Sequence, residues 1–383
     1  MAHSFQLATR IEFGSGYINN AGIEAKKLGI TKVMLIADKG IIGAGLVKPI
    51  EDSLKKEKVD YVIYDKIVPN PRDIHCIEGA EFGKEHKIDG IIAIGGGSSL
   101  DTAKAIGTLI TNGGNIRTWA GFGLLKNEIP PMIAIPTTEG TGSEVTFDAV
   151  ITDTEAHEKL NILDLKIAPK VALVDPDVLL GLPKRVMAAC GVDAFIHAFE
   201  AYTCRVANPH TDAMALHAME IIVENLRGAV HNPDIDNCTG MMLGSNLAGI
   251  AFGYSDVAGI HCIAEALGGR YDIPHGVANS IVLPEVTEFN IPANIEKYAR
   301  VSRILGVDTS GMDTEKAAYS CVDALIQMRK DVDIPKMSEL EVIDPKDFRE
   351  LADASFRNLS TPSNPRDITA EDYFNILNKA YFG

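Results

Sequence analysis

The feature that most strongly constrains the fold of this 383-residue chain lies in its first half. There, short apolar runs alternate with helix-like segments. The runs are continuous and bounded by Gly, Asp or Pro, as is typical of strands buried on both faces of a parallel sheet. This alternation predicts an α/β domain in which helices cover the sheet. Strands are expected at 33–37, 59–64, 90–94, 131–135 and 171–174, with helices at 46–56 and 74–86.

Beyond about residue 180 the pattern changes to long segments rich in Ala, Leu and Met. Their apolar positions recur every three or four residues, which indicates helices. We therefore expect an α/β domain over 1–180 and an all-helical domain over 181–383, with no flexible linker between them. Domains joined in this way are expected to leave a cleft, a common place for a site. The helical segments are expected at 183–204, 212–226, 238–252, 292–305 and 314–329.

The composition argues against several classes of partner. The chain has 36 Lys and Arg against 52 Asp and Glu, a net charge of −16, which disfavours binding to nucleic acid or anionic lipid. No run reaches the roughly 18 apolar residues of a membrane helix, and residues 1–13 lack the pattern of a secretory signal. The six scattered cysteines predict reduced thiols and a cytoplasmic protein.

A glycine-rich turn, Gly95-Gly-Gly-Ser-Ser-Leu-Asp101, follows the strand expected at 90–94. Glycine allows the backbone to approach a ligand closely, and free N–H groups at the start of the next helix favour an anion such as pyrophosphate. We expect Ser98 or Ser99 to cap that helix. The turn matches neither GxGxxG nor a P-loop, so a purely structural role stays open.

Two other loops follow expected strands. Asp38 can accept hydrogen bonds from a ribose 2′-hydroxyl and would repel a 2′-phosphate, which favours NAD over NADP. It can equally be an ordinary helix cap. The loop 137–146 is dense in hydroxyl groups and glycine, so it can donate hydrogen bonds to a ligand.

One aspartate and three histidines have a spacing that suits a metal. Asp193 and His197 lie four residues apart in an expected helix and therefore share a face. His261 falls on another expected helix, and His275 follows a proline in a turn. One carboxylate and three imidazoles suit Fe²⁺ or Zn²⁺ with an open position for a substrate oxygen. A simple helix pair and hydrogen-bonded structural histidines remain the alternative.

Taken in order, these motifs resemble the iron-containing (group III) alcohol dehydrogenases over nearly the whole chain. The most specific matches are Gly95–Gly107, Thr137–Thr146, Gly191–Tyr202 and Pro274-His-Gly276. The resemblance implies an N-terminal dinucleotide-binding α/β domain with a parallel sheet and an all-α C-terminal domain, an architecture shared with dehydroquinate synthase. The metal would lie in the cleft. Homo-oligomers, dimers or larger, are common among such relatives.

The resemblance also implies the site residues. Fe²⁺, with Zn²⁺ as the alternative, would be bound by Asp193, His197, His261 and His275. NAD would be held by residues of the α/β domain, namely Asp38, Gly96, Gly97, Ser98, Asp101, Thr137, Thr138, Thr141, Thr146 and Lys159. The candidate catalytic residues are Glu265 and His275.

Two positions depart from the family pattern. Glu265 stands where a second histidine is usual, one turn after His261, and Glu139 replaces the usual alanine of the threonine-rich loop. Glu265 could relay protons, join the metal ligands or pair with a cation such as Arg270. If both carboxylates face the cleft, we expect them to disfavour an anionic substrate.

The resemblance implies a metal-dependent, NAD(H)-linked alcohol dehydrogenase or aldehyde reductase. It would transfer a hydride between nicotinamide and a small alcohol or aldehyde bound to a divalent metal. One alternative is a relative like glycerol dehydrogenase or dehydroquinate synthase, which usually binds metal with three protein ligands. The other is a metal- or nucleotide-binding protein without turnover, which the missing histidine at position 265 would allow.

Overall fold

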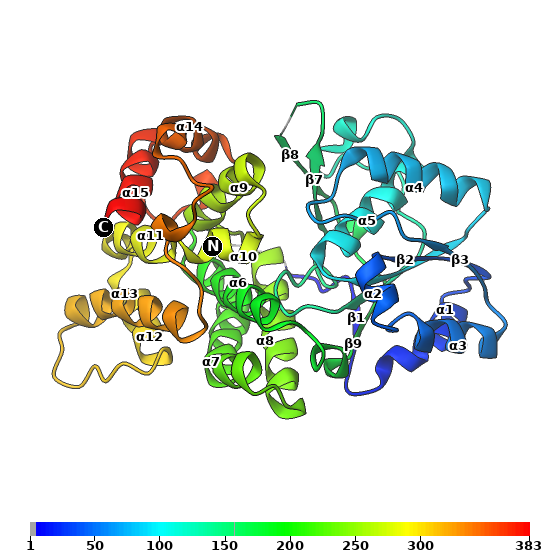
Figure 1. Ribbon diagram of the computed structural model, residues 1–383, viewed down its shortest axis with the longest axis horizontal. Coiled ribbons are helices and arrows are strands. Elements are labelled where there is room, and N and C mark those ends of the chain that lie inside the picture. The colour runs from blue at the N-terminus through cyan, green and yellow to red at the C-terminus, as the bar shows by residue number, and fades with distance from the viewer. Residues whose placement is uncertain (1–4, 157) are drawn as a thin grey trace. The chain divides into compact units, whose positions relative to one another are not determined.

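The structure is a computed structural model that describes residues 5–156 and 158–383 (Figure 1). The chain divides into two compact units, Gln6–Leu182 and Pro183–Gly383, and Phe5 belongs to the second. The Phe5 ring stacks on His210 with 5.4 Å between ring centroids. The first four residues of the domain expected over 1–180 lie outside the described residues.

Within the described residues, the first unit is built on a six-stranded parallel sheet with the order β1-β9-β6-β4-β2-β3. The five apolar runs are all strands of this sheet, which confirms the expected fold. The short first strand was not expected, because Arg10 and Glu12 interrupt its apolar character. The strands are β1 (Arg10–Phe13), β2 (Lys32–Ala37), β3 (Asp60–Tyr64), β4 (Gly90–Gly95), β6 (Met132–Pro136) and β9 (Val171–Val174).

Helices cover both faces of this sheet. Met34, Ile91 and Met132 point from neighbouring strands into a core shared with α4 and α5. The alternate residues of these strands are also buried, as a doubly covered sheet requires. The helices of this unit are α1 (Ala21–Lys27), α2 (Lys39–Gly43), α3 (Lys48–Glu57), α4 (Asp73–Glu85) and α5 (Gly97–Asn112).

A second, smaller sheet in the same unit was not expected. It has the order β5-β8-β7 and contains β5 (Gly121–Phe122), β7 (Asp148–Asp153) and β8 (Glu158–Leu163). Buried and partly exposed residues alternate along β7. Its apolar run covers only 149–151 and is flanked by Asp148 and Thr152, so it is shorter than the runs of the large sheet.

The strand order creates a switch point between β2 and β4. The chain leaves β2 to form β3 on one side and returns to form β4 on the other. In open α/β sheets, ligands bind outside the carboxyl ends of strands at such a point. Asp38 follows β2 and Gly95 ends β4, so both lie at this position.

The second unit is helical throughout its described part (Figure 1). Its central helix α6 is buried from Met187 to Thr203 apart from Cys190, which matches a helix without a polar face. The expected helical segments are confirmed. The helices are α6 (Lys184–Thr203), α7 (Pro209–His231), α8 (Ile235–Gly253), α9 (Gly259–Tyr271), α10 (His275–Ser280), α11 (Leu283–Asn290), α12 (Ile295–Ile304), α13 (Thr314–Asp331), α14 (Phe348–Arg357) and α15 (Ala370–Phe382).

Two further observations bear on the expectations from composition. The six cysteines are free thiols, as expected. Among the described residues, no helix combines the length and apolar character that crossing a membrane demands.

Candidate metal centre and cofactor turn

Four side chains of the helical unit converge on one point. Asp193 and His197 lie one turn apart on α6, His261 is in the first turn of α9, and His275 begins α10. One ligand atom from each lies within 4.8 Å of the others. Two atoms each about 2.0–2.2 Å from a shared ion lie at most about 4.4 Å apart, so the widest pair would have to draw slightly together around an ion. The expected convergence of these residues is therefore present in the structure.

The ionisation of these side chains suits a cation. Burial lowers the pKa of His197 and of His261 to about 3, so both rings are neutral and can offer a lone pair. Burial opposes ionisation of Asp193, but the three imidazoles and Asn279 outweigh it and hold the pKa of the carboxyl below its usual value. The Nε2 atoms of His197 and His261 lie 3.0 Å apart. A divalent ion fits this set of one carboxylate and facing imidazoles.

The position of His275 depends on a glycine. A Cβ atom at Gly276 would lie 2.1 Å from the carbonyl oxygen of Ala189 on α6, so α10 can approach α6 this closely only at a glycine. His275 Nε2 then lies 3.9 Å from Asp193 Oδ1. Asn279, one turn further along α10, donates its Nδ2–H to that oxygen at 2.7 Å. This packing accounts for the Pro274-His-Gly276 motif.

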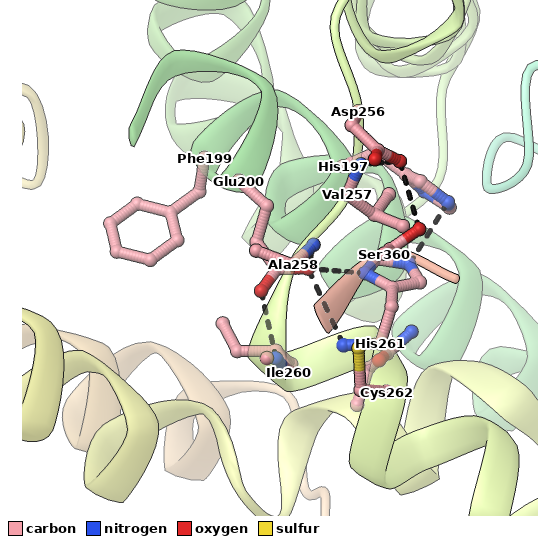
Figure 2. A network of polar contacts seen from close by, with 12 residues as sticks. His197, Phe199, Glu200, Asp256, Val257, Ala258, Ile260, His261, Cys262 and Ser360 are labelled. Carbon is pink, nitrogen blue, oxygen red and sulfur yellow. Dashed lines mark hydrogen bonds and ion pairs between the residues drawn. The ribbon is translucent and has the colours of Figure 1, made fainter. Parts of the chain in front are cut away.

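Glu200 on α6 contacts His261 directly (Figure 2). Its Oε2 lies 2.6 Å from His261 Nδ1, and it also accepts hydrogen bonds from the backbone N–H groups of Ala258 and Ile260, at 2.9 and 2.8 Å. Burial raises the pKa of Glu200 to about 7, while these N–H groups oppose the shift. The sequence analysis missed this residue. Its position seven residues after Asp193, on the same helix face, was the available signal.

Glu265, the first candidate catalytic residue, lies outside the cluster of four ligands. It is half-buried on α9 and accepts a hydrogen bond from Asn358 Nδ2 at 2.7 Å. Arg270 forms its ion pair with Asp347, at 3.1 Å. A role for Glu265 in proton transfer stays a prediction.

The glycine turn differs from expectation in one respect. Helix α5 begins at Gly97 and its N-cap is Gly96, so Ser98 and Ser99 lie in the first turn and the prediction that either caps the helix is wrong. Gly95, the last residue of β4, has a φ of +149°, which favours glycine, and the helix starts two residues later. The first N–H groups of α5 lack partners within the helix, as at any helix start. They remain suited to an anion.

The threonine-rich loop packs against this turn. Thr137 donates its backbone N–H to the carbonyl oxygen of Gly95 at 3.0 Å. A Cβ atom at Gly97 would lie 2.6 Å from Thr141 Cγ2, and one at Gly96 would lie 3.2 Å from Thr138 Oγ1. The loop and the glycine turn thus form one surface at the carboxyl ends of β4 and β6.

Asp38 combines the two roles considered for it. Its Oδ1 accepts a hydrogen bond from Ile41 N at 2.9 Å and so caps α2. Its Oδ2 lies 3.8 Å from the place a Cβ atom of Gly95 would occupy. Helix capping therefore leaves one carboxylate oxygen beside the glycine turn.

Three other predicted cofactor residues take part in hydrogen bonds within the protein. Asp101 accepts hydrogen bonds from Ser143 Oγ at 2.7 Å and from a backbone N–H. Lys104, which the sequence analysis missed, is fully buried and donates to Thr146 Oγ1 at 3.1 Å and to Ser143 Oγ at 2.9 Å. Lys159 on β8 donates to Thr152 Oγ1 at 2.9 Å. These contacts stabilise the segments that flank the turn.

Glu139 does not add the negative charge that was expected of it. Its side chain is fully buried, and neither carboxyl oxygen has a hydrogen-bond partner among the described residues. Burial raises the pKa of Glu139 to about 8, so the carboxyl group is mostly protonated at neutral pH. The expectation that it disfavours anionic substrates by its charge is therefore wrong.

A parallel α/β unit with a glycine turn, together with a helical unit holding three histidines and an aspartate, is the arrangement expected of a metal-dependent dehydrogenase. Known proteins agree with this assignment. The chain matches the models of the iron-containing alcohol dehydrogenases over residues 8–176 and of the C-terminal part of the Fe-containing alcohol dehydrogenase family over residues 187–381. The chain belongs to the iron-containing alcohol dehydrogenase family, and it is an oxidoreductase of the alcohol dehydrogenase and aldehyde reductase type.

Individual relatives resemble the chain over its full length. An NAD-dependent methanol dehydrogenase of Bacillus methanolicus is 37% identical over 96% of this chain and 97% of its own. A lactaldehyde reductase of Escherichia coli (strain K12) is 37% identical over 100% of both chains. The crystal structure of a 1,3-propanediol oxidoreductase superposes with a TM-score of 0.97 and 34% identity, over 99% of this chain and 100% of that one. The similarity therefore includes both units.

Proposed function

We propose that this chain catalyses the NAD(H)-linked interconversion of a small alcohol and its aldehyde at a divalent metal ion. Asp193, His197, His261 and His275 would hold the ion. The observation that carries the proposal is the convergence of these four ligand atoms within 4.8 Å, in a chain of this family. The four-ligand set also favours a dehydrogenase over scaffold relatives with three ligands.

Each unit has its own task in this proposal. The unit Gln6–Leu182, expected as a domain over 1–180, would bind NAD, and the unit Pro183–Gly383, expected over 181–383, would bind the metal and the substrate. A divalent ion supplies Lewis-acid stabilisation of an alkoxide, and the nicotinamide supplies or accepts the hydride. Supporting this division, the glycine turn is in the first unit and the histidine cluster in the second.

Protein groups bind and orient the cofactor and the ligands. The N–H groups at the start of α5 suit the pyrophosphate, and the free oxygen of Asp38 suits a ribose hydroxyl while repelling a 2′-phosphate. Asn279 orients the Asp193 carboxylate through its 2.7 Å hydrogen bond. Glu265, which accepts a hydrogen bond from Asn358, stays the candidate proton acceptor.

The substrate is proposed to be small and neutral. The names of the relatives above refer to methanol, lactaldehyde and 1,3-propanediol, all of which are small and uncharged. Fe²⁺ is the proposed metal, with Zn²⁺ as the alternative, because both accept histidine and carboxylate ligands. A homo-oligomer also stays a proposal, which light scattering of the purified protein would test.

The test is an NADH oxidation assay with metal-free protein reconstituted separately with Fe²⁺ and Zn²⁺. We expect steady NADH consumption with short neutral aldehydes, slower turnover with carboxylated or sulfonated ones, and loss of activity with a chelator. A lyase-type reaction would show no net change in NADH absorbance. Absence of turnover with every aldehyde and both metals would contradict the proposal and favour a binding protein.

A further inference from the structure

We propose that Glu200 is a positioning residue of the metal centre, which fixes both the tautomer and the location of His261. The inference rests on the proposed metal site and extends it to a residue that contacts a ligand rather than the metal. Glu200 comes from α6, the helix that also carries Asp193 and His197. It therefore ties the two ligands on α6 to the third ligand on α9.

The hydrogen-bond pattern determines the tautomer of His261. A neutral imidazole carries one N–H, and Nδ1 lies 2.6 Å from a carboxyl oxygen that also accepts the N–H of Ala258. An ionised Glu200 can only accept a hydrogen bond, which places the ring hydrogen on Nδ1 and the lone pair on Nε2. That Nε2 faces His197 Nε2 at 3.0 Å, inside the cluster. Glu200 consequently points the metal-binding nitrogen of His261 toward the other ligands.

The same carboxyl group also determines where α9 begins. The N-cap of α9 is Ala258, whose side chain cannot accept a hydrogen bond. Glu200 replaces it by accepting from the N–H groups of Ala258 and Ile260 and, at 3.4 Å, from that of His261 (Figure 2). Both the helix start and the ring are therefore held by one side chain.

Capping alone does not account for this arrangement. Helices α7 and α8 are capped by their own residues, Asn208 and Asp234, which is the ordinary solution. Glu200 is only 2% exposed, and burial of a carboxyl group is costly. A single Ser, Asp or Asn at position 258 could cap α9 without that cost. The contact with His261 lets the Glu200 carboxyl position the imidazole ring as well as cap the helix, which a capping side chain at position 258 would not do.

The experiment compares Glu200→Gln with Asp256→Asn in the full chain. Asp256 is a half-buried carboxyl close in sequence to the start of α9 that accepts hydrogen bonds from Ser360 and Ser363, at 2.9 and 2.5 Å, and is not among the four ligands. Both variants lose a hydrogen-bonded carboxylate of the helical unit. Zn²⁺ affinity is measured by competition with a chromophoric chelator, thermal unfolding is measured on the metal-free proteins, and NADH affinity is measured by fluorescence.

We expect Glu200→Gln to bind Zn²⁺ about 10- to 100-fold more weakly than the unsubstituted protein. Asp256→Asn is expected to keep its Zn²⁺ affinity within about threefold, although its metal-free form unfolds at a lower temperature. NADH affinity should be unchanged in both. Equal Zn²⁺ affinities of the two variants would overturn the inference, because Glu200 would then act only in stability. Failure of the unsubstituted protein to bind Zn²⁺ or Fe²⁺ would instead overturn the proposed function, and this inference with it.

A second measurement does not require Glu200→Gln to fold. Long-range ¹H–¹⁵N correlation spectra of the metal-free protein labelled at histidine report the tautomer of each ring, and His261→Gln assigns the signal. We expect an Nδ1–H tautomer for His261. An Nε2–H tautomer would overturn the inference.

Discussion

The Nε2 atoms of His197 and His261 face each other at 3.0 Å, and His261 Nδ1 lies 2.6 Å from Glu200 Oε2. With the ring hydrogen on Nδ1, as proposed, His261 Nε2 lacks a hydrogen, so one proton at most can lie between the two nitrogens. A divalent ion bound by both rings satisfies two lone pairs at once. This relationship makes metal binding and stability of the helical unit interdependent.

Removal of the metal should accordingly lower the stability of the protein. A ligand that binds only the folded state at 100 times its Kd adds about 2.7 kcal/mol to the free energy of unfolding. We expect the unfolding temperature to rise with Fe²⁺ or Zn²⁺ concentration and to fall with a chelator. His261→Ala is the matched control, since its unfolding temperature should no longer respond to the metal. An equal response in the variant would mean that the ion binds elsewhere.

Gly276→Ala should displace α10 and weaken metal binding. The added Cβ would lie 2.1 Å from the Ala189 carbonyl oxygen, and overpacking of this kind typically costs about 1–3 kcal/mol. The control is Gly269→Ala on α9, where a Cβ meets no atom within 4 Å among those described. Chemical denaturation and Zn²⁺ competition check both variants. Native-like Zn²⁺ affinity in Gly276→Ala would show that the close approach does not position His275.

Asp38→Asn should relax the preference for NAD while the fold keeps its stability. Asn is as good an N-cap as Asp, so α2 stays capped through the contact with Ile41 N. The negative charge that would repel a 2′-phosphate is lost. We expect the ratio of kcat/KM for NADPH to that for NADH to rise about tenfold or more. The unfolding temperature checks the cap, and an unchanged cofactor ratio would place the ribose away from Asp38.

Glu139 should make stability depend on pH in a defined direction. Its pKa is raised from 4.5 to about 8 in the folded chain, so the unfolded chain loses this proton first as pH rises. The contribution of the Glu139 proton to the free energy of unfolding is fully present below about pH 4.5. It declines as pH rises toward 8. Denaturation of the unsubstituted protein and of Glu139→Gln from pH 5 to 9 tests this. With rising pH, the free energy of unfolding of the unsubstituted protein should fall relative to that of Glu139→Gln. A difference between the two that stays constant with pH would contradict the raised pKa.

Strands could be predicted from the sequence where consecutive residues are all buried, because such strands consist of unbroken apolar runs. The strand Met132–Pro136 is buried at every residue and could be predicted from its apolar run. The strand Asp148–Asp153 alternates between buried and partly exposed residues, and its apolar run, 149–151, is too short to match the pattern of a strand buried on both faces. Strand Arg10–Phe13 has too few apolar residues and is placed by its pairing with β9, a long-range contact.

The candidate site was predictable to the extent that it depends on residue type. Asp193, His197, His261 and His275 have ligand chemistry, and the resemblance grouped them before their distances were known. Asn279 and Lys104 do not have this ligand chemistry, and Glu200 has it but takes its role from a contact with α9. All three roles come from contacts between helices or loops far apart in sequence. The assignment of Ser98 or Ser99 as a cap failed because the helix begins at Gly97 with Gly96 as its N-cap, before either serine.

The central claim is that one divalent ion is shared by the carboxylate and the three imidazoles. Anomalous diffraction at the iron edge, from crystals of the protein reconstituted with Fe²⁺, tests it most directly. We expect a single strong peak about 2.0–2.2 Å from a ligand atom of Asp193, His197, His261 and His275. Crystals of active enzyme that show no peak among these side chains, or a peak bound elsewhere, would contradict the account.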